Sequence, residues 1–370
     1  MLTYIPHHVP LKSQANQGAF IRTQSLVDFV RSLPGGRVVI PSRLCFDPLT
    51  GLLLILGTIR FTRNKYILLS YPNLPFFDAN PVNQFFFNLF IRAARSLCRA
   101  GGKRLILDAD DIPSLSEPYL RKWPQSPRRL ARLKRMEQEL LNGVDVIWTI
   151  TDGLAQAIGQ AYGIPREKFV LAPNGNLRLN LKPKLPPGDA IRVIYAGAFF
   201  WAGIKEMLLS FTRLRTGRTI EFYLLGPYAE WLPSFLAQLN DRRIKFLGAL
   251  NHPECEAIVR SCQVGVLCYD PAEKYYSLAH PVKLSLYITS GVPVVTTDIG
   301  AAAALVKKEE LGLVSSFPDM TPALQRMIED AALRDRCAAN CRRISEDYYF
   351  DRIYRRALAE SEQVLRRKEQ

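Results

Sequence analysis

The fold follows from the stretch Ala279-His-Pro-Val-Lys-Leu-Ser-Leu-Tyr-Ile-Thr-Ser-Gly-Val-Pro-Val-Val-Thr-Thr-Asp298. An apolar strand predicted over Val264–Tyr269 enters the loop that opens this stretch. Pro281 then stands at the first position of a short helix and Gly291 just past its end, the usual places for these residue types. A second apolar strand, Val292–Thr297, completes a β–α–β unit, which predicts a parallel sheet with right-handed crossovers.

The start of this helix is predicted to bind an anion. The loop lies at the carboxyl end of a parallel strand, where open α/β sheets bind ligands, and the first N–H groups of the helix point into it. The first turn of a helix usually carries Asp or Glu, but this one carries Lys283, with His280 beside it and no acid. We expect this uncompensated positive charge to face a phosphate group.

Length and composition indicate two domains in a reducing compartment. The chain has 370 residues, of which 48% are apolar and 22% charged, so it can bury two ordinary cores. The seven cysteines are odd in number and form no Cys-x-x-Cys pair, which speaks against a disulfide framework and against a zinc site. Free thiols are typical of a reducing compartment.

Neither a signal peptide nor a membrane span is expected. Met1–Pro10 lacks the basic-then-apolar order of a signal peptide, and the longest apolar run, around Leu52–Leu56, is far too short to cross a bilayer. We therefore expect a cytoplasmic protein that is soluble, or at most peripheral at the inner face of the membrane. The net charge of +15 predicts an anionic partner: nucleic acid, a phosphorylated substrate or an acidic membrane surface.

Apolar strands alternate with amphipathic helices in two series along the chain. After a helix at 19–33, strands of the first series are predicted at 36–41, 65–70, 103–107 and 144–150. Those of the second are predicted at 191–196, 220–225, 244–247, 264–269 and 292–297. Asn251 and Glu254 form a capping-box pattern at the start of the helix before the 264–269 strand.

A proline-rich segment, residues 177–189, separates the two series and has no hydrophobic period, which is typical of a linker. The sequence thus predicts two doubly wound, Rossmann-like α/β domains, at residues 1–176 and 190–344. Residues 345–370 are predicted to form a C-terminal helix that crosses back toward the first domain.

Several short motifs follow one another in the second half in a fairly specific order. They are Tyr195-Ala-Gly-Ala-Phe-Phe-Trp-Ala-Gly203, Phe246-Leu-Gly248, Val264-Gly-Val266, Pro281-Val-Lys-Leu284, Gly291-Val-Pro-Val-Val-Thr-Thr-Asp298 and Gly312-Leu-Val314. This half resembles the donor-binding domain of GT-B glycosyltransferases of the broad family 4-like group. The first half resembles the same enzymes through the loop Gln14–Ala19, and through Val144–Thr149 followed by Ala172-Pro-Asn-Gly175.

The resemblance implies two domains facing across a cleft, with a nucleotide-diphospho-sugar bound mainly to the second. The donor-binding positions that it implies are Gly197, Ala198, Lys205, Asn174, His280, Pro281, Val282 and Lys283. It implies no cofactor and no metal, since GT-B donors are generally held without one.

Two departures from the family pattern concern the donor. Relatives usually carry two glutamates, which touch the donor sugar and the ribose hydroxyls, at the positions of Leu278 and Leu286. A leucine side chain accepts no hydrogen bond. The basic pair that relatives hold against the diphosphate falls near Ala198 or Phe199 and at Ala202, and Lys205 is close but out of register. The helix nevertheless resembles that of a branch with galactofuranosyltransferase-like and adhesin-modifying glucosyltransferase proteins, which lacks the glutamate.

Three acids at the end of a first-half strand form a second candidate site. In Leu107-Asp-Ala-Asp-Asp-Ile-Pro-Ser-Leu115 the carboxylates follow a strand directly, so Asp110 and Asp111 are predicted at the carboxyl edge of the sheet. Relatives of the same branch carry a His-Asp-Leu-Pro-Ser-Leu pattern here, which implies a catalytic role for both. Clustered acids repel one another unless they are solvated, paired or used, so helix capping or pairing with an arginine is the alternative. His7 and His8, at the end of the first strand, either face the cleft or are solvated loop residues.

A basic face is predicted in the first half, where Arg128, Arg132 and Arg135 recur at helical spacing within the basic segment 121–135. Such a run is usually a solvated face. Because acceptors of the resembling enzymes are often lipid-linked, contact with an anionic membrane surface is the alternative. The aromatic run Phe85-Phe86-Phe87 with Phe90 fits either a membrane face or the core. Nucleic acid is not expected as a partner, because no binding motif interleaves with the charge.

Two classes of function agree with these patterns. The first is a metal-independent hexosyltransferase-type enzyme that moves a sugar from its nucleotide diphosphate to a hydroxyl of a glycan, lipid-linked or protein-linked acceptor. The resemblance implies that the anomeric configuration is retained. The second is a non-catalytic GT-B subunit that binds a partner glycosyltransferase or a glycan. A sugar-nucleotide epimerase of the same fold is a more distant third.

Overall fold

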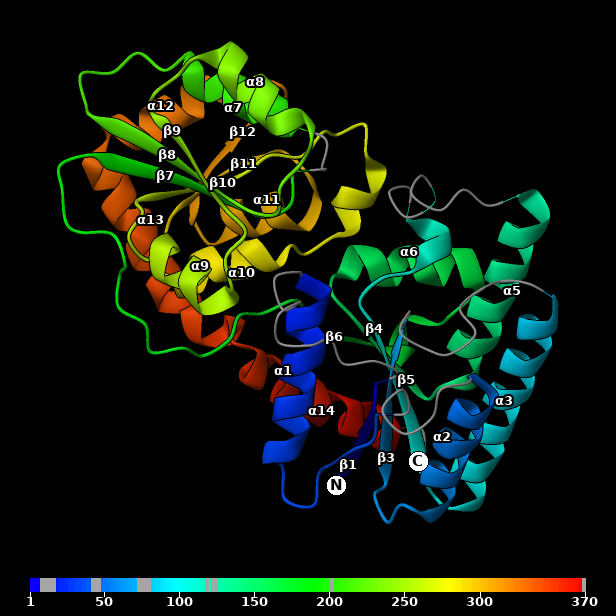
Figure 1. The fold of residues 1–370 in the computed structure, drawn as a ribbon. Helices are drawn as coiled ribbons and strands as arrows, with labels where there is room; N and C mark the ends of the chain where they lie inside the picture. Colours follow the sequence, from blue (N-terminus) through cyan, green and yellow to red (C-terminus); the bar gives the residue numbers. More distant parts are fainter. Residues whose placement is uncertain are drawn as a thin grey trace. The chain divides into compact units, whose positions relative to one another are not determined.

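The computed structural model describes residues 1–6, 18–40, 48–71, 81–116, 120, 126–199 and 203–367. These residues divide into two compact units (Figure 1). The described residues of Met1–Pro10, Arg22–Pro173 and Ile353–Gln370 form the first unit, and those of Leu11–Ile21 and Asn174–Arg352 form the second. The chain thus enters the second unit at Asn174, a few residues before the predicted linker, and re-enters the first within its C-terminal helix.

The first unit contains a six-stranded parallel sheet with the order β2-β1-β3-β4-β5-β6. Its strands are β1 (Leu2–Ile5), β2 (Arg37–Val38), β3 (Tyr66–Tyr71), β4 (Arg104–Ala109), β5 (Val146–Thr149) and β6 (Phe169–Leu171). Its helices are α1 (Gly18–Ser32), α2 (Pro48–Phe61), α3 (Pro81–Ala100), α5 (Pro127–Gly143), α6 (Asp152–Tyr162) and α14 (Phe350–Arg367), with 3₁₀ turns η3 (Pro113–Leu115) and η4 (Arg166–Lys168).

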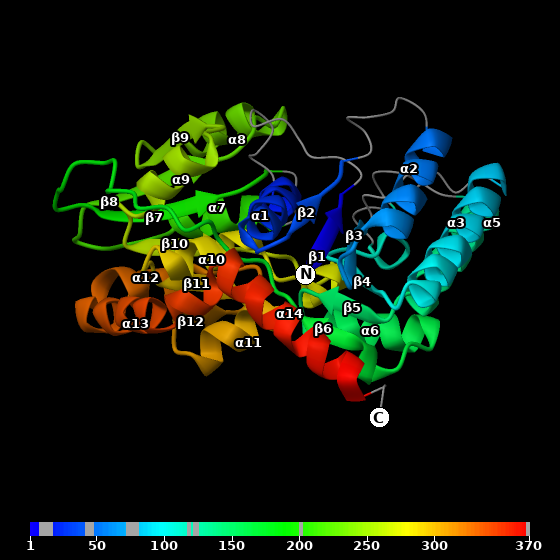
Figure 2. The same cartoon turned by 90° about the horizontal axis from the view of Figure 1, so that it is seen from below.

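Helices cover both faces of this sheet, with α1 and α14 on one face and α2, α3 and α5 side by side on the other (Figure 2). The helix α14 is tied to β5 by Trp148, whose ring stacks on Tyr354 at 6.2 Å and whose Nε1 donates to Ser361 Oγ at 2.8 Å. The C-terminal helix therefore completes the core of the first unit.

The second unit contains another six-stranded parallel sheet, with the order β12-β11-β10-β7-β8-β9. Its strands are β7 (Ile191–Ala196), β8 (Ile220–Leu225), β9 (Ile244–Gly248), β10 (Val264–Leu267), β11 (Val294–Thr297) and β12 (Gly312–Ser315). Its helices are α7 (Ile204–Thr212), α8 (Trp231–Leu239), α9 (His252–Val259), α10 (Val282–Thr289), α11 (Gly300–Lys308), α12 (Thr321–Glu329) and α13 (Ala331–Ile344), with 3₁₀ turns η5 (Lys274–Leu278) and η6 (Ser345–Tyr348).

Two hydrophobic clusters, one on each face, hold the second sheet between its helices. Side chains alternate along β7, so that Val193 and Tyr195 join one cluster while Ile194 and Ala196 join the other. This arrangement confirms the predicted doubly wound architecture, with two Rossmann-like sheets.

The predicted strands 191–196 and 220–225 have the bounds of β7 and β8, and the capping box of Asn251 and Glu254 is present at the start of α9. The other predicted strands and the helix predicted at 19–33 differ from the observed elements by one to three residues at their ends. Two further differences concern where a helix begins. The helix α10 begins at Val282, so Pro281 is its N-cap residue and not its first residue. Residues 345–348 form a 3₁₀ turn, and α14 begins only at Phe350.

Candidate functional site

The loops after β7 and β10 open at the point where the second sheet reverses its strand order. From β7 the chain continues to β8 and β9 on one side, and from β10 to β11 and β12 on the other. The strands β7 and β10 are themselves neighbours, with Val264 opposite Val193. Open α/β sheets bind ligands outside the carboxyl ends of the two strands at such a point. Gly197 follows β7 directly, and α10 follows the loop after β10.

The first turn of α10 has no side-chain cap. Its N-cap residue, Pro281, is extended (φ −69°, ψ 132°) and offers no oxygen on its side chain, and no acid lies in the first turn. The amide groups at a helix start carry partial positive charge and are satisfied by a cap, by water or by an anion. The amides of Val282 and Lys283 therefore have no side-chain cap, and the anion expected here from the sequence stays a prediction.

The side chain of Lys283 lies half-buried between two tyrosines. Its Nζ donates to Tyr195 Oη at 3.0 Å, and lies 4.4 Å from the Tyr195 ring centroid and 5.4 Å from that of Tyr269. Among the described residues, no carboxylate lies within ion-pair distance of this ammonium group. Burial lowers the pKa of Lys283 to about 7. Because a bound anion favours the protonated form, this lysine can gain its charge when a phosphate arrives.

The absence of a side chain at Gly197 leaves room for the ammonium group of Lys283. A Cβ built on this glycine would lie only 2.7 Å from Lys283 Nζ and 3.2 Å from Tyr195 Oη. Tyr195 Oη in turn donates to Ala198 O at 2.8 Å, which links the loop after β7 to the lysine. The structure thus brings Gly197, Ala198 and Lys283 together.

Asn174 and His280, 106 residues apart, are also brought together. Asn174 Nδ2 donates to His280 O at 2.8 Å, and Ser285 Oγ of α10 donates to Asn174 O at 2.6 Å. His280 Nε2 lies 3.1 Å from Ser285 Oγ, and the imidazole ring stacks on Tyr348. Since His280 is only 5% exposed, its ring packs beneath the start of α10, and its backbone carbonyl holds Asn174.

The segment that carries Asn174 is anchored two residues later by Asn176, which is fully buried. Asn176 Nδ2 donates to Thr289 Oγ1 at 2.8 Å and to Glu256 Oε2 at 3.1 Å, while its Oδ1 lies 2.7 Å from His252 Nε2. Burial lowers the pKa of His252 to about 4, so this ring is neutral and donates to the amide oxygen. The segment from Asn174 to Asn176 is therefore held against both α9 and α10.

Lys205 and the two leucines do not join this group. The Lys205 ammonium lies over the rings of Trp231 and Phe235 in α8, at 5.2 and 5.5 Å. Leu286 is 4% exposed and packs in a core cluster of the second unit, and Leu278 ends η5. The positions of the family glutamates thus supply no carboxylate here.

The acids around the end of β4 separate into one buried carboxylate, Asp108, and two half-buried ones, Asp110 and Asp111. Asp108, within β4, is buried and forms a two-point ion pair with Arg22 of α1, with N···O distances of 2.5 and 3.1 Å. Asp110 and Asp111 follow the strand and are half-buried. Burial, together with the Asp108 carboxylate, raises the pKa of Asp110 to about 7. A carboxyl group with that pKa can both accept and release a proton at neutral pH.

A buried carboxylate holds the turn that follows these acids. Glu137 of α5 has no exposed surface and accepts hydrogen bonds from Ser114 N at 3.2 Å, from Tyr71 Oη at 2.9 Å and from Tyr162 Oη. Burial raises the pKa of Glu137. Through Glu137, the turn η3 is therefore held against the ends of β3 and α6. This fixes the backbone that directly follows Asp111.

The structure describes the aromatic run and, of the basic segment, residues 126–135. The helix α5 begins at Pro127, with Arg128 and Arg135 exposed and Arg132 half-buried. In α3, Phe87 and Phe90 are core residues at 2% exposure, whereas Phe85 is 64% exposed. His7, His8, residues 14–17, residues 121–125 and residues 200–202 lie outside the described residues, so the predictions made for them stay predictions.

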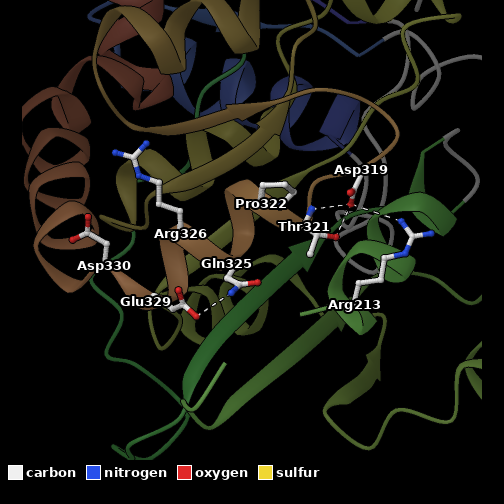
Figure 3. Close-up of a pocket in the computed structure, with 8 residues that line it drawn as sticks. All are labelled: Arg213, Asp319, Thr321, Pro322, Gln325, Arg326, Glu329 and Asp330. Carbon is white, nitrogen blue, oxygen red and sulfur yellow. Dashed lines mark hydrogen bonds and ion pairs between the residues drawn. The ribbon is translucent and has the colours of Figure 1, made fainter. Parts of the chain in front are cut away.

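The described cavities lie apart from these residues. A shallow cavity of about 750 Å³ in the second unit shares no residue with the cluster around Lys283 (Figure 3). Its lining consists of Arg213, Asp319, Thr321, Pro322, Gln325, Arg326, Glu329 and Asp330. Within the described ranges, no group of three or more His, Cys, Asp or Glu side chains is suited to hold a metal ion, and no helix is long and apolar enough to span a membrane.

Four side chains that hold the candidate site residues or the segments beside them are not predicted from the sequence: Tyr195, Tyr269, Ser285 and Glu137. Tyr195 stands within a quoted motif and Ser285 within the opening stretch, but nothing in the local pattern shows that a tyrosine hydroxyl meets Lys283. Glu137 lies in the basic helix on its inward face, so the spacing from Arg132 and Arg135 could have marked it as buried.

Comparisons with known proteins concern the fold and the C-terminal part of the chain. A family model for the C-terminal domain of glucosyltransferase 3-like proteins matches residues 240–360. No curated protein sequence gives a significant match. Sucrose-phosphate synthase from Thermosynechococcus elongatus is similar in structure, with a TM-score of 0.67, 15% identity and 98% of each chain covered.

Two further solved structures are similar over the whole chain. HepE from Anabaena, solved in complex with UDP and glucose, has a TM-score of 0.63 and 14% identity, with 100% of this chain and 99% of that chain covered. Trehalose 6-phosphate synthase from Burkholderia multivorans has a TM-score of 0.64 and 13% identity, with the same coverage. The chain therefore has the GT-B glycosyltransferase fold, with residues 240–360 similar to the C-terminal domain of glucosyltransferase 3-like proteins.

Proposed function

We propose that the protein transfers a sugar from a nucleotide-diphospho-sugar to a hydroxyl acceptor. One observation carries the proposal: Lys283, Gly197 and the uncapped start of α10 converge at the strand-order reversal of the second sheet. A half-buried lysine without a described carboxylate, beside free helix amides, suits a diphosphate. The GT-B fold and the match to the glucosyltransferase 3-like model support a sugar nucleotide as its carrier.

The proposed chemistry is mainly electrostatic. The bond between the anomeric carbon and the diphosphate oxygen breaks, and negative charge grows on the leaving diphosphate. The Lys283 ammonium and the amides of Val282 and Lys283 are already in place, so they stabilise this charge without rearrangement. Gly197 and Ala198 line the same place, with Pro281, His280 and Asn174 supporting the start of α10. No step in this scheme needs a metal ion.

The first unit is proposed to act on the acceptor. The new bond joins the anomeric carbon to the acceptor oxygen, whose proton passes to a base. Asp110, with its pKa raised to about 7, can take that proton, and Asp111 can hold the acceptor hydroxyl. Hexosyl transfer with retention of the anomeric configuration, to a glycan, lipid-linked or protein-linked hydroxyl, completes the proposal.

The proposal also includes a location. Peripheral association with the inner face of the membrane, through Arg128, Arg132 and Arg135, would bring the first unit to a lipid-linked acceptor. The exposure of Arg128 and Arg135 on α5 supports it.

A non-catalytic GT-B subunit is the second candidate. It is favoured by Leu286, which packs in the core at a position where the resembling enzymes carry a carboxylate. Such a subunit could bind a sugar nucleotide or a glycan and leave the sugar attached.

A sugar-nucleotide panel separates the two. UDP-glucose is the first probe, because HepE was also solved in complex with UDP-glucose, and GDP-, ADP- and TDP-sugars follow. A bound donor should raise the melting temperature of the folded protein, and release of nucleoside diphosphate over time should report turnover. Binding without release would favour the subunit, and neither binding nor release with the whole panel would contradict the proposed enzyme.

A further inference from the structure

Large apolar side chains are exposed on neighbouring helices of the first unit. They are Leu53 (60%), Phe61 (80%), Val82 (62%), Phe85 (64%) and Leu89 (54%), all on α2 and α3. The two helices pack against each other, and α3 packs against α5, so the three form one outer layer over the sheet (Figures 1 and 2). Clustered exposed apolar side chains mark a binding surface more often than isolated ones do.

The exposed residues of α3 lie on one face. Val82, Phe85 and Leu89 are spaced by three and four residues, which places them along one stripe of a helix. The opposite face carries Phe87 and Phe90, which are buried. The first half of α3 is therefore apolar on both sides, although only the inner side contacts the sheet.

A basic stripe on α5 runs beside the apolar stripe. Arg128, Arg132 and Arg135 share one face, and the next residue along that face is Glu139. Its Oε1 accepts a 2.9 Å hydrogen bond from Arg92 Nε, and Arg92 continues the apolar stripe of α3 after Leu89. This bond joins the two stripes on the outer surface.

The apolar stripe of α3 and the basic stripe of α5 lie toward the same edge of the sheet. Both helices are crossovers between parallel strands, so both start at the carboxyl edge of the sheet and run the same way. The Arg92–Glu139 hydrogen bond aligns the two helices along their length. Residues 82–89 of α3 and 128–135 of α5, which precede this bond in each helix, therefore both lie on the side of the carboxyl edge. Asp110 and Asp111 follow β4 at this edge of the same sheet.

Basic residues predominate in this layer, whose described acids are Glu137, which is buried, and Glu139, which pairs with Arg92. Helices α2 and α3 carry four arginines (Arg60, Arg92, Arg95 and Arg99) and no acid, and the segment 127–135 of α5 carries five basic residues and no acid. An apolar stripe bordered by cations is complementary to a bilayer with anionic headgroups, into which apolar side chains insert while arginines contact phosphates.

We propose that α2, α3 and α5 form one docking face for an anionic bilayer, in which Phe85 and Leu89 insert below the headgroups. This deepens the membrane association included in the proposed function, because it adds an insertion that salt does not screen. It also places the lipid surface at the sheet edge that carries Asp110 and Asp111, where a lipid-linked acceptor would present its hydroxyl.

Vesicle sedimentation of the full chain tests the face. Vesicles of phosphatidylcholine with about one third phosphatidylglycerol should bind the protein at low salt, and a smaller part of the binding should persist at high salt, because burial of apolar surface is not screened. Phe85→Ser with Leu89→Ser should weaken binding at least about tenfold at both salt concentrations, since each large side chain loses its apolar burial. Reversal of Arg128, Arg132 and Arg135 to Glu should remove binding mainly at low salt.

Matched controls lie on the second unit. Tyr228→Ser removes an apolar side chain of similar exposure (67%), and the triple change of Arg218, Arg242 and Lys308 to Glu makes the same charge difference at exposed positions. Both should bind vesicles like the unmodified chain. Phe85→Trp should bind normally, and bromine-labelled lipids should quench the fluorescence of the added tryptophan.

The outcomes are separable. If Phe85→Ser with Leu89→Ser binds like the unmodified chain at every salt concentration, the insertion is wrong and a purely electrostatic contact remains. If the unmodified chain binds no vesicles and forms a dimer that the same double variant dissociates, a second copy covers the face and the proposal is overturned. The affinity for UDP-glucose, measured on the same variants by calorimetry, should not change. Loss of vesicle binding would therefore not argue against the donor site, and loss of donor binding would not argue against the docking face.

Discussion

The ammonium group of Lys283 lies 4.4 Å from the centroid of the Tyr195 ring and donates a 3.0 Å hydrogen bond to the hydroxyl of the same tyrosine. The π-face and the hydroxyl oxygen offset part of the cost of burying a cation, but neither carries a negative charge. The lysine is therefore held in place without an opposite charge beside it among the described residues. This arrangement suits a site that binds an anion.

Replacement of Lys283 should weaken donor binding and leave the fold intact. We expect Lys283→Ala to reduce the affinity for a nucleoside diphosphate by about 1.5–3 kcal/mol, the worth of a charge-assisted hydrogen bond. Lys274→Ala removes an exposed lysine of the neighbouring turn η5 and should bind normally. Titration calorimetry on both variants measures the difference, and an unchanged affinity in Lys283→Ala would sink the phosphate assignment.

A methyl group at Gly197 should act on the same site from the other side. The added Cβ of Gly197→Ala would lie 2.7 Å from Lys283 Nζ, so the flexible end of the lysine must move away. We expect a loss of donor affinity of at least about threefold with a nearly unchanged melting temperature, because only a side-chain end is displaced. If the variant binds the donor like the unmodified chain, the ammonium position is not needed for binding.

Donor affinity should depend on pH through Lys283. Since its pKa is lowered to about 7, the free protein carries a neutral lysine above that pH, and an anionic donor must bind together with a proton. Affinity for UDP-glucose should therefore fall as the pH rises above about 7, by up to about tenfold per pH unit, until the pKa of the complex is reached. Calorimetry in buffers of different ionisation enthalpy should show proton uptake at pH 8 that is absent in Lys283→Ala. A flat affinity from pH 6 to pH 9 would argue against a titrating lysine.

The acids after β4 should govern turnover more than donor binding. We expect Asp111→Asn to slow transfer about 100-fold or more with little change in donor affinity, because general acid–base and positioning groups act mainly in the transition state. In the intact protein, the rate should rise with pH around 7 if Asp110 accepts the proton, since its carboxyl group must first ionise. Initial rates from pH 5 to pH 9 for Asp110→Asn, Asp111→Asn and the unmodified chain provide the measurement. A large loss of donor affinity in Asp111→Asn would place this residue at the donor instead.

The Arg22–Asp108 pair should contribute to stability and not to binding. Arg22 is 1% exposed, and Arg22→Met leaves the buried Asp108 carboxylate without its cation, which should cost about 3–5 kcal/mol of unfolding free energy. Arg166→Ala breaks an ion pair with Asp152 whose side chains are both more than half exposed, and should cost less than about 1 kcal/mol. Urea denaturation of the two variants gives the comparison. Equal losses would show that Asp108 finds another partner.

How far the sequence predicts this protein is visible in single elements. Strands β7 and β8 and the capping box of α9 follow from local signals, since hydrophobic runs and cap residues act over a few positions. The sequence does not predict β6, because three residues give too little periodicity to separate a strand from a loop. The residues of β12 are marked only as a motif, Gly312-Leu-Val314, and not as a strand. Within the candidate site, Gly197, Ala198 and Lys283 do converge, whereas Lys205 lies on Trp231 and Phe235 of α8.

The sequence by itself determined the β–α–β pattern, the uncapped helix that starts with a lysine, and the acids that follow a strand, because each is written in neighbouring residues. Only the tertiary structure decided which side chains meet: Lys283 with Tyr195, 88 positions away, and Arg22 with Asp108, 86 positions away. Such pairs depend on the order of strands in a sheet and on which face each helix covers, and no local period encodes that order. Burial, which depends on the tertiary fold, is also the main cause of the lowered pKa of Lys283 and of the raised pKa of Asp110, to which the nearby Asp108 carboxylate adds.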